Sequence, residues 1–132
     1  MALVARNADA GIDMATASVA PQISGLIAGE DLDLCAPVYI AAADGKVYMS
    51  DGSAANEAAG IDGFTARAVK QGQPVTMFGA GTRMGYGTGL TPGAVYYIAA
   101  TAGRLDTAAT TGGLVPVAKA ITSTDIRVIR DA

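Results

Sequence analysis

The chain has 132 residues and a formal net charge of −3, with 17 glycines, one cysteine, no tryptophan and no histidine. A chain of this length is expected to form one domain that buries about two thirds of its unfolded surface. The lack of histidine excludes a histidine base, the single Cys35 excludes an intramolecular disulfide, and the lack of a basic run argues against a nucleic-acid partner.

Residues 1–29 differ in composition from the rest of the chain. They are rich in alanine and small polar residues, lack a hydrophobic period, and contain Gly11 and Pro21, which disfavour one continuous helix. A short helix is expected at most within residues 8–20. We predict that residues 1–29 form an extended N-terminal arm or an edge strand outside the central core, and that the arm becomes ordered on a neighbouring subunit. Residues 30–132 then form a β-rich domain.

One segment occurs twice. The run YIAA at residues 39–42, followed by GKV at 45–47, recurs as YIAA at 97–100, followed by GRL at 103–105. The offset is constant at 58 residues, from 39 to 97. Each copy is a short β-rich run, a glycine turn and a second apolar run, which is typical of a β-hairpin. The sequence therefore predicts a duplicated hairpin unit.

Further strands are predicted between and after the two hairpins. A polar loop with one helical turn is expected at residues 51–59, and a glycine-rich irregular stretch at 79–93. Alternating or apolar runs predict strands at residues 60–70, 74–78, 94–99, 114–121 and 125–130. Because each half ends in a turn and an apolar strand, we predict an all-β fold: a small β-barrel or clip with internal pseudo-twofold symmetry.

The charge is unevenly distributed along the chain. Residues 1–63 carry two bases and nine acids, whereas residues 64–132 carry seven bases and three acids. Two interpretations stay open. Complementary faces could meet between subunits, or the fold could interleave the halves and cancel the difference in space.

Three groups of residues are candidates for chemistry. The glycine run at 79–93 matches neither phosphate-binding motif, because Met84 stands where a glycine is needed, so Arg83 alone could meet an anion. Asp31 and Asp33 could share a face and hold Ca²⁺, but a solvated turn is the simpler interpretation. The tyrosines of the two hairpins suit half-buried strand positions or a subunit interface. They are Tyr39, Tyr48, Tyr96 and Tyr97.

No catalytic centre can be assembled from these residues. Cys35 lies in an apolar run without a histidine base, so we expect a buried hydrophobe and not a nucleophile. We predict no catalytic, cofactor-binding or metal site, and no enzymatic activity. No signal peptide is visible, and Pro92 and several glycines interrupt the uncharged stretch at 84–103, so we expect synthesis in the cytoplasm and no membrane contact.

The order of several short motifs resembles that of the small capsid decoration (cement) and head-fibre proteins of tailed bacteriophages. The motifs are APVYIAA at residues 36–42, GQPVTMF at 72–78, GLTPGAVYYIAATAGRL at 89–105 and PVAKAITSTDIRV at 116–128. Together with AGE at residues 28–30, they extend over nearly everything after the arm.

This resemblance implies a β-tulip or barrel-like domain without enzymatic activity. It also implies a homotrimer on threefold axes at the outer surface of the virion, where the major capsid protein is the partner and the shell is stabilised. An alternative is a receptor- or carbohydrate-binding module of a phage fibre or tail, for which Tyr86 in the glycine run is the candidate contact. A small clip-type enzyme for sugars or anions is a third class, and the lack of histidine and of a convergent polar cluster counts against it.

Overall fold

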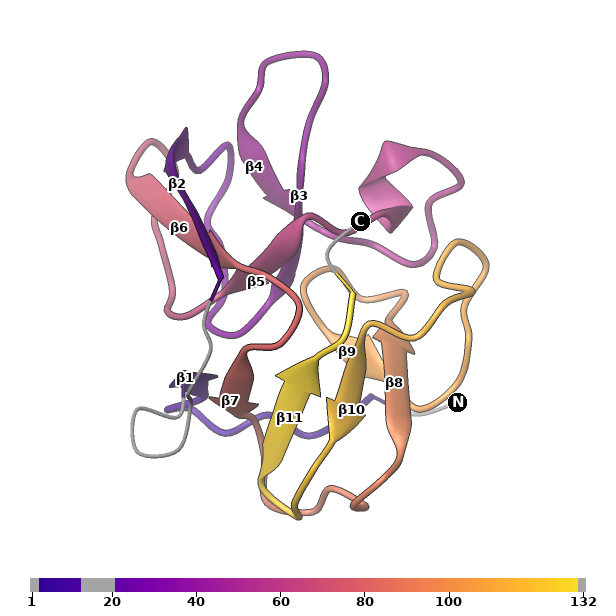
Figure 1. Cartoon of the computed structure of the whole chain (residues 1–132). Helices are drawn as coiled ribbons and strands as arrows, with labels where there is room; N and C mark the ends of the chain where they lie inside the picture. Colours follow the sequence, from indigo (N-terminus) through magenta and orange to yellow (C-terminus); the bar gives the residue numbers. More distant parts are fainter. Residues whose placement is uncertain (1–2, 13–20, 131–132) are drawn as a thin grey trace.

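The computed structural model describes residues 3–12 and 21–130 and shows an all-β fold, which confirms the predicted fold class (Figure 1). Eleven strands and one short 3₁₀ helix occur in these residues. In chain order they are β1 (Gly11–Ile12), β2 (Gln22–Ile27), β3 (Pro37–Ile40), β4 (Val47–Met49), η1 (Glu57–Ala59), β5 (Gly63–Thr65), β6 (Pro74–Phe78), β7 (Arg83–Gly85), β8 (Val95–Ile98), β9 (Leu105–Asp106), β10 (Ala118–Ala120) and β11 (Asp125–Val128).

The strands form two antiparallel sheets. One has five strands in the order β2-β6-β5-β3-β4, and the other has six in the order β1-β7-β11-β10-β8-β9. Neither sheet closes into a barrel within the described residues. In the five-stranded sheet, a single bridge between Ala28, which follows β2, and Val47 on β4 connects the two edges of the sheet. The structure therefore has two open sheets in place of the predicted barrel. Figure 1 shows one sheet above the other.

The duplication predicted from the sequence is confirmed by the topology. Strands β7-β11-β10-β8-β9 repeat the order β2-β6-β5-β3-β4, so each half of the chain forms the same five-stranded unit. The hairpin registers also agree: Ile40 faces Val47, and 58 residues later Ile98 faces Leu105. The two halves therefore form separate sheets, except that β1 from the first half joins the sheet of the second half.

The N-terminal segment belongs to the fold and not to a free arm. Its described residues supply β1 at the edge of the six-stranded sheet and β2 at the edge of the five-stranded sheet, as the edge-strand alternative expected. Val4, Ala10 and Ala28 are buried in the two cores, which corrects the expectation that residues 1–29 lie outside the core. In Figure 1 this segment passes behind β11, β10 and β8. Of the short helix expected at residues 8–20, residues 8–12 form a turn and β1, and residues 13–20 lie outside the described residues.

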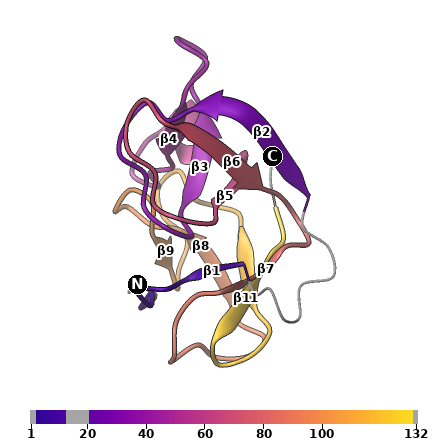
Figure 2. The ribbon, with the colours of Figure 1, turned by 90° about the vertical axis from the view of Figure 1, so that its left-hand side faces the viewer.

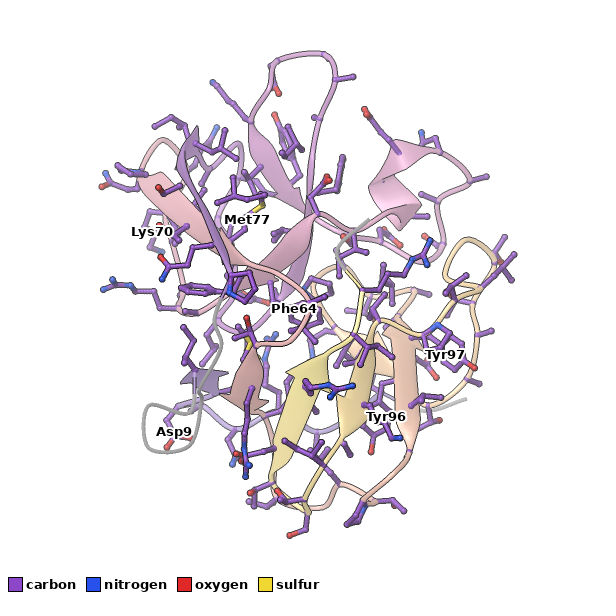
Figure 3. The ribbon with its side chains drawn as sticks, in the orientation of Figure 1. Asp9, Phe64, Lys70, Met77, Tyr96 and Tyr97 are labelled. Atoms are coloured by element: carbon purple, nitrogen blue, oxygen red, sulfur yellow. The ribbon has the colours of Figure 1, made fainter. Side chains whose placement is uncertain are left out.

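The buried apolar side chains form two hydrophobic cores. The larger lies between the sheets and contains Phe64, which Figure 3 shows midway between them. The smaller is enclosed by the curled five-stranded sheet and contains Met77. Successive side chains of β6 point to opposite faces of the sheet, so Phe78 lies in the larger core and Met77 in the smaller one. Both faces of β6 are therefore covered.

Three elements differ most from the prediction. β7 lies inside the glycine-rich stretch, because Met84 is buried between β1 and β11. The strand expected at 60–70 ends at Thr65, and the strand expected at 114–121 begins only at Ala118. Leu114 remains 69% exposed in the preceding loop.

Candidate functional site

The Cys35 thiol is enclosed in the larger core. Its side chain is fully buried, and its Sγ lies 3.3 Å from Met84 Sδ. Burial raises the pKa of the thiol from 9.0 to about 12, although the nearby Arg6 charge opposes this shift. The thiol therefore stays protonated at physiological pH and lacks the thiolate that a nucleophile needs.

The two aspartates considered for Ca²⁺ point to different partners. Asp31 accepts a hydrogen bond from the Gln71 backbone N–H at 2.9 Å and lies 3.7 Å from Lys70 Nζ. Asp33 Oδ2 lies 3.2 Å from Arg6 Nη2. Among residues 3–12 and 21–130, no group of three or more acidic, cysteine or histidine side chains is placed to hold a metal ion.

The glycine-rich stretch is packed into the fold. Met84, Tyr86 and Leu90 from this stretch are buried in the larger core. A Cβ at Gly87 would collide with the Ala5 carbonyl oxygen, so this glycine permits close contact with the N-terminal segment. Arg83, the residue considered for an anion, donates from Nε to Asp125 Oδ2 at 2.8 Å.

Three cations form a row across the outer face of the six-stranded sheet. Arg127 on β11 faces Arg83 on β7 and Lys119 on β10 in the strand register. Directly opposite residues on antiparallel strands project to the same face. Lys119 in turn faces Val95 on β8, which is 36% exposed. We call Arg83, Arg127 and Lys119 the basic row. The three residues are far apart in sequence, so only the register reveals it.

Carboxylates and tyrosines gather around the β3–β4 hairpin. Tyr39 and Tyr48 face each other across the hairpin, with ring centroids 6.0 Å apart and planes at 31°. Burial raises the pKa of Tyr39, and the charges of four carboxylates raise it further: Glu57, Glu30, Asp44 and Asp51. We call these four carboxylates and two tyrosines the acidic patch.

Hydrogen bonds hold the carboxylates of the acidic patch in place. Glu57 accepts from the Ala42 N–H at 3.1 Å, and Glu30 accepts from the Met49 N–H at 2.9 Å. Asp44 accepts from the Tyr48 hydroxyl at 2.6 Å, and this bond lowers the pKa of Asp44 and raises that of Tyr48. The patch is therefore a fixed anionic surface with its aromatic rings beside it.

The outer edge of β2 is open. In the described residues, Gln22–Ile27 forms backbone hydrogen bonds only with β6, and it carries no charged side chain. Ile23 is 48% exposed and Ile27 is 38% exposed. Figure 2 shows β2 on the outside of its sheet beside β6. The strand is irregular, with a register shift between Ile23 and Leu26 and Gly25 at a φ of 87°, but its uncharged backbone edge and exposed isoleucines leave it open to a strand of another chain.

A groove borders the same part of the molecule. It has a volume of about 600 Å³ and lies beside β6, where Arg67, Lys70, Gln22 and Phe78 contribute to its walls. Lys70 marks this side of the sheet in Figure 3. The groove mixes cationic and apolar side chains and adjoins the open β2 edge.

Comparison with known proteins gives no relative. No family model matches the chain, and neither the curated proteins nor the solved structures contain a detectable match. Within the described residues, no helix has the length and apolar character needed to cross a bilayer.

Proposed function

We propose that the chain is a structural virion protein that binds the outer surface of a bacteriophage capsid as a homotrimer and stabilises the shell. The motif order quoted above supports this proposal. On this proposal the major capsid protein is the partner, and neither nucleic acid nor a membrane is bound. The work of the protein is burial of surface at junctions between subunits, and it needs no catalytic residue.

The observation that carries the proposal is the difference between two equivalent edges. β2 and β7 hold the same place in the two repeats, at the start of each five-strand order. The edge of β7 is covered by β1, whereas the edge of β2 is covered by no strand of the described chain. The six-stranded sheet thus has an added strand at this position, and the described part of the five-stranded sheet has none. We propose that a strand of a capsid subunit occupies it by β-augmentation.

The test is binding of the purified protein to undecorated capsid shells. We expect saturable loading at a fixed ratio and a higher temperature of shell disruption. Lysine at Ile23 and Ile27 should abolish loading, because charged side chains on an edge block strand addition. Leu114→Lys is the matched control, since Leu114 is 69% exposed but lies outside the sheets. Loading of the Ile23→Lys/Ile27→Lys variant at the wild-type level would refute the proposed contact, and no loading of the wild type would refute the function.

A fibre or tail module that binds a receptor or carbohydrate remains the second candidate. Tyr86, the residue expected to serve it, is 0% exposed and cannot contact a ligand. The acidic patch supplies the polar-aromatic surface that such a module needs, through Tyr39 and Tyr48. Glycan binding that Tyr48→Ala removes, with no binding to shells, would favour this function over the first.

A further inference from the structure

The basic row carries an electrostatic cost in the isolated chain. Arg127 stands directly opposite both Arg83 and Lys119, and like charges at such positions destabilise a sheet. Asp125 offsets the charge of Arg83 at 2.8 Å. The side chains of Arg127 and Lys119 form no ion pair or hydrogen bond with any described residue. An anionic partner would remove this repulsion.

The row is fixed on a rigid support. Ala118 and Ala120 flank Lys119, and Ile126 and Val128 flank Arg127, and all four are 0% exposed in the larger core. The backbone positions of the two cations are therefore set by core packing. The backbone of the row therefore needs no ordering when a partner binds, and only the two exposed side chains lose freedom.

A surface of opposite charge lies elsewhere on the same chain. The acidic patch combines four carboxylates with two tyrosine rings, and tyrosine faces attract arginine and lysine. In Figure 1 the β3–β4 hairpin rises at the top, while β10 and β11 lie in the lower half. The hairpin and the basic row belong to different sheets, and no ion pair joins Lys119 or Arg127 to the acidic patch in the described chain.

We propose that the basic row of one copy binds the acidic patch of a second copy. The contact joins two different surfaces, so it is head-to-tail and can close into a ring. This proposal rests on the proposed function only for the existence of a homo-oligomer, and it names the surfaces through which the copies meet. It also gives a role to the opposite charges of the two halves of the chain.

The first test measures the mass of the protein in solution at several salt concentrations and in charge-reversed variants. Light scattering should show self-association at low ionic strength that weakens as salt rises, because exposed charge pairs are screened. Lys119→Glu/Arg127→Glu should weaken association by about tenfold or more, since it places carboxylates against the acidic patch. Arg67→Glu/Lys70→Glu makes the same change in net charge in the loop between β5 and β6, outside both surfaces, and should associate as the wild type. Circular dichroism checks that each variant is folded.

The second test exchanges the charges. Asp44→Lys/Glu57→Lys should also lose self-association, with Asp44→Asn/Glu57→Gln as the variant that keeps hydrogen-bond acceptors but removes the charges. A mixture of Lys119→Glu/Arg127→Glu with Asp44→Lys/Glu57→Lys should associate again, because both contacts between unlike copies regain opposite charges. Restored mass in the mixture supports the proposal. A monomeric wild type would overturn it. So would wild-type self-association of either Lys119→Glu/Arg127→Glu or Asp44→Lys/Glu57→Lys alone.

Shell binding is measured separately on the same variants. If the Lys119→Glu/Arg127→Glu variant is monomeric but still loads onto shells, the head-to-tail contact and the capsid function both stand. If the wild type associates through the two surfaces but ignores shells, only the proposed function fails.

Discussion

Gly45 and Gly103 occupy the same place in two hairpins 58 residues apart, and both have left-handed backbones, with φ of 70° and 74°. The hydrogen bond that closes each turn is also the same, from Ala41 N–H to Lys46 O and from Ala99 N–H to Arg104 O, each 2.9 Å. Their surroundings differ. A Cβ at Gly45 would meet no atom within 4 Å, whereas a Cβ at Gly103 would overlap Met49 Sδ.

Alanine at the two glycines should therefore have unequal effects. Gly45→Ala should lower the free energy of unfolding by about 1 kcal/mol, the cost of a side chain in the left-handed region. Gly103→Ala should cost about 2–4 kcal/mol, because the clash with Met49 adds to the same strain. Chemical denaturation measures both. In a Met49→Ala background the difference should shrink, and an unchanged difference would show that Met49 is not the cause.

Two buried threonines should respond in opposite directions to valine. Thr82 is 0% exposed, and its Oγ1 has no hydrogen-bond partner among the described residues, so Thr82→Val should raise the free energy of unfolding by about 1 kcal/mol. Thr65 Oγ1 accepts from the Ala36 N–H at 3.0 Å and donates to the Asp33 carbonyl at 2.6 Å. Thr65→Val should lower the free energy of unfolding by about 1–3 kcal/mol, because both partners lose their bond. Thermal unfolding of the two variants should shift the melting temperature up and down, respectively.

Stability should fall in alkaline solution because of Cys35. Its pKa is about 12 in the folded chain and 9.0 when exposed, so between these values the unfolded chain releases a proton that the folded chain retains. Within this range the free energy of unfolding falls by about 1.4 kcal/mol for each pH unit. Below pH 9 the contribution of the Cys35 thiol to stability is fully present. Denaturation at several pH values measures the slope. Cys35→Ala should flatten it, and an equal slope in that variant would assign the loss to other groups.

The N-terminal segment should be needed for stability. Arg6 is only 9% exposed at its side chain, and it donates to the Gly103 carbonyl at 3.0 Å and to Asp33 at 3.2 Å. Arg6→Gln should lower the free energy of unfolding by about 1–3 kcal/mol. Arg130→Gln, at an exposed cation, is the control. Deletion of residues 1–29 should prevent folding, since it removes β1, β2 and buried core residues. A deleted chain with wild-type circular dichroism would contradict this assignment.

The hairpins were predictable because their signals are local. Asp44-Gly45 marks the first turn, and the second copy repeats it through Gly103, so spacing and turn chemistry were sufficient. β7 was missed because its three residues, Arg83–Gly85, have no strand pattern and are held by pairing with β1 and β11. The burial of residues from the segment at 1–29 was missed for a similar reason. Its alanines are small, and Val4 and Ala10 become buried only through distant partners.

The surfaces were less predictable than the fold. The charge difference between the halves was visible in the sequence, but it did not say which cations would stand together. Arg83, Lys119 and Arg127 meet because β10, β11 and β7 are neighbours, and strand order is a tertiary property. The carboxylates around Tyr39 come from four separate places in the first half, and the fold of the hairpin and η1 brings them together.

The pairing of β1 with β7 also orders events during synthesis. The first five-stranded unit is contiguous in sequence, from Gln22 to Phe78, so all its strands have been synthesised before Arg83. β1 precedes this unit but has no strand partner until β7 has been synthesised. β1 must therefore wait for its strand partner until about 70 further residues, roughly half of this chain, have been synthesised. During that interval the growing chain exposes both the unpaired β1 and the open edge of β2, and unpaired strands of this kind favour association with other chains.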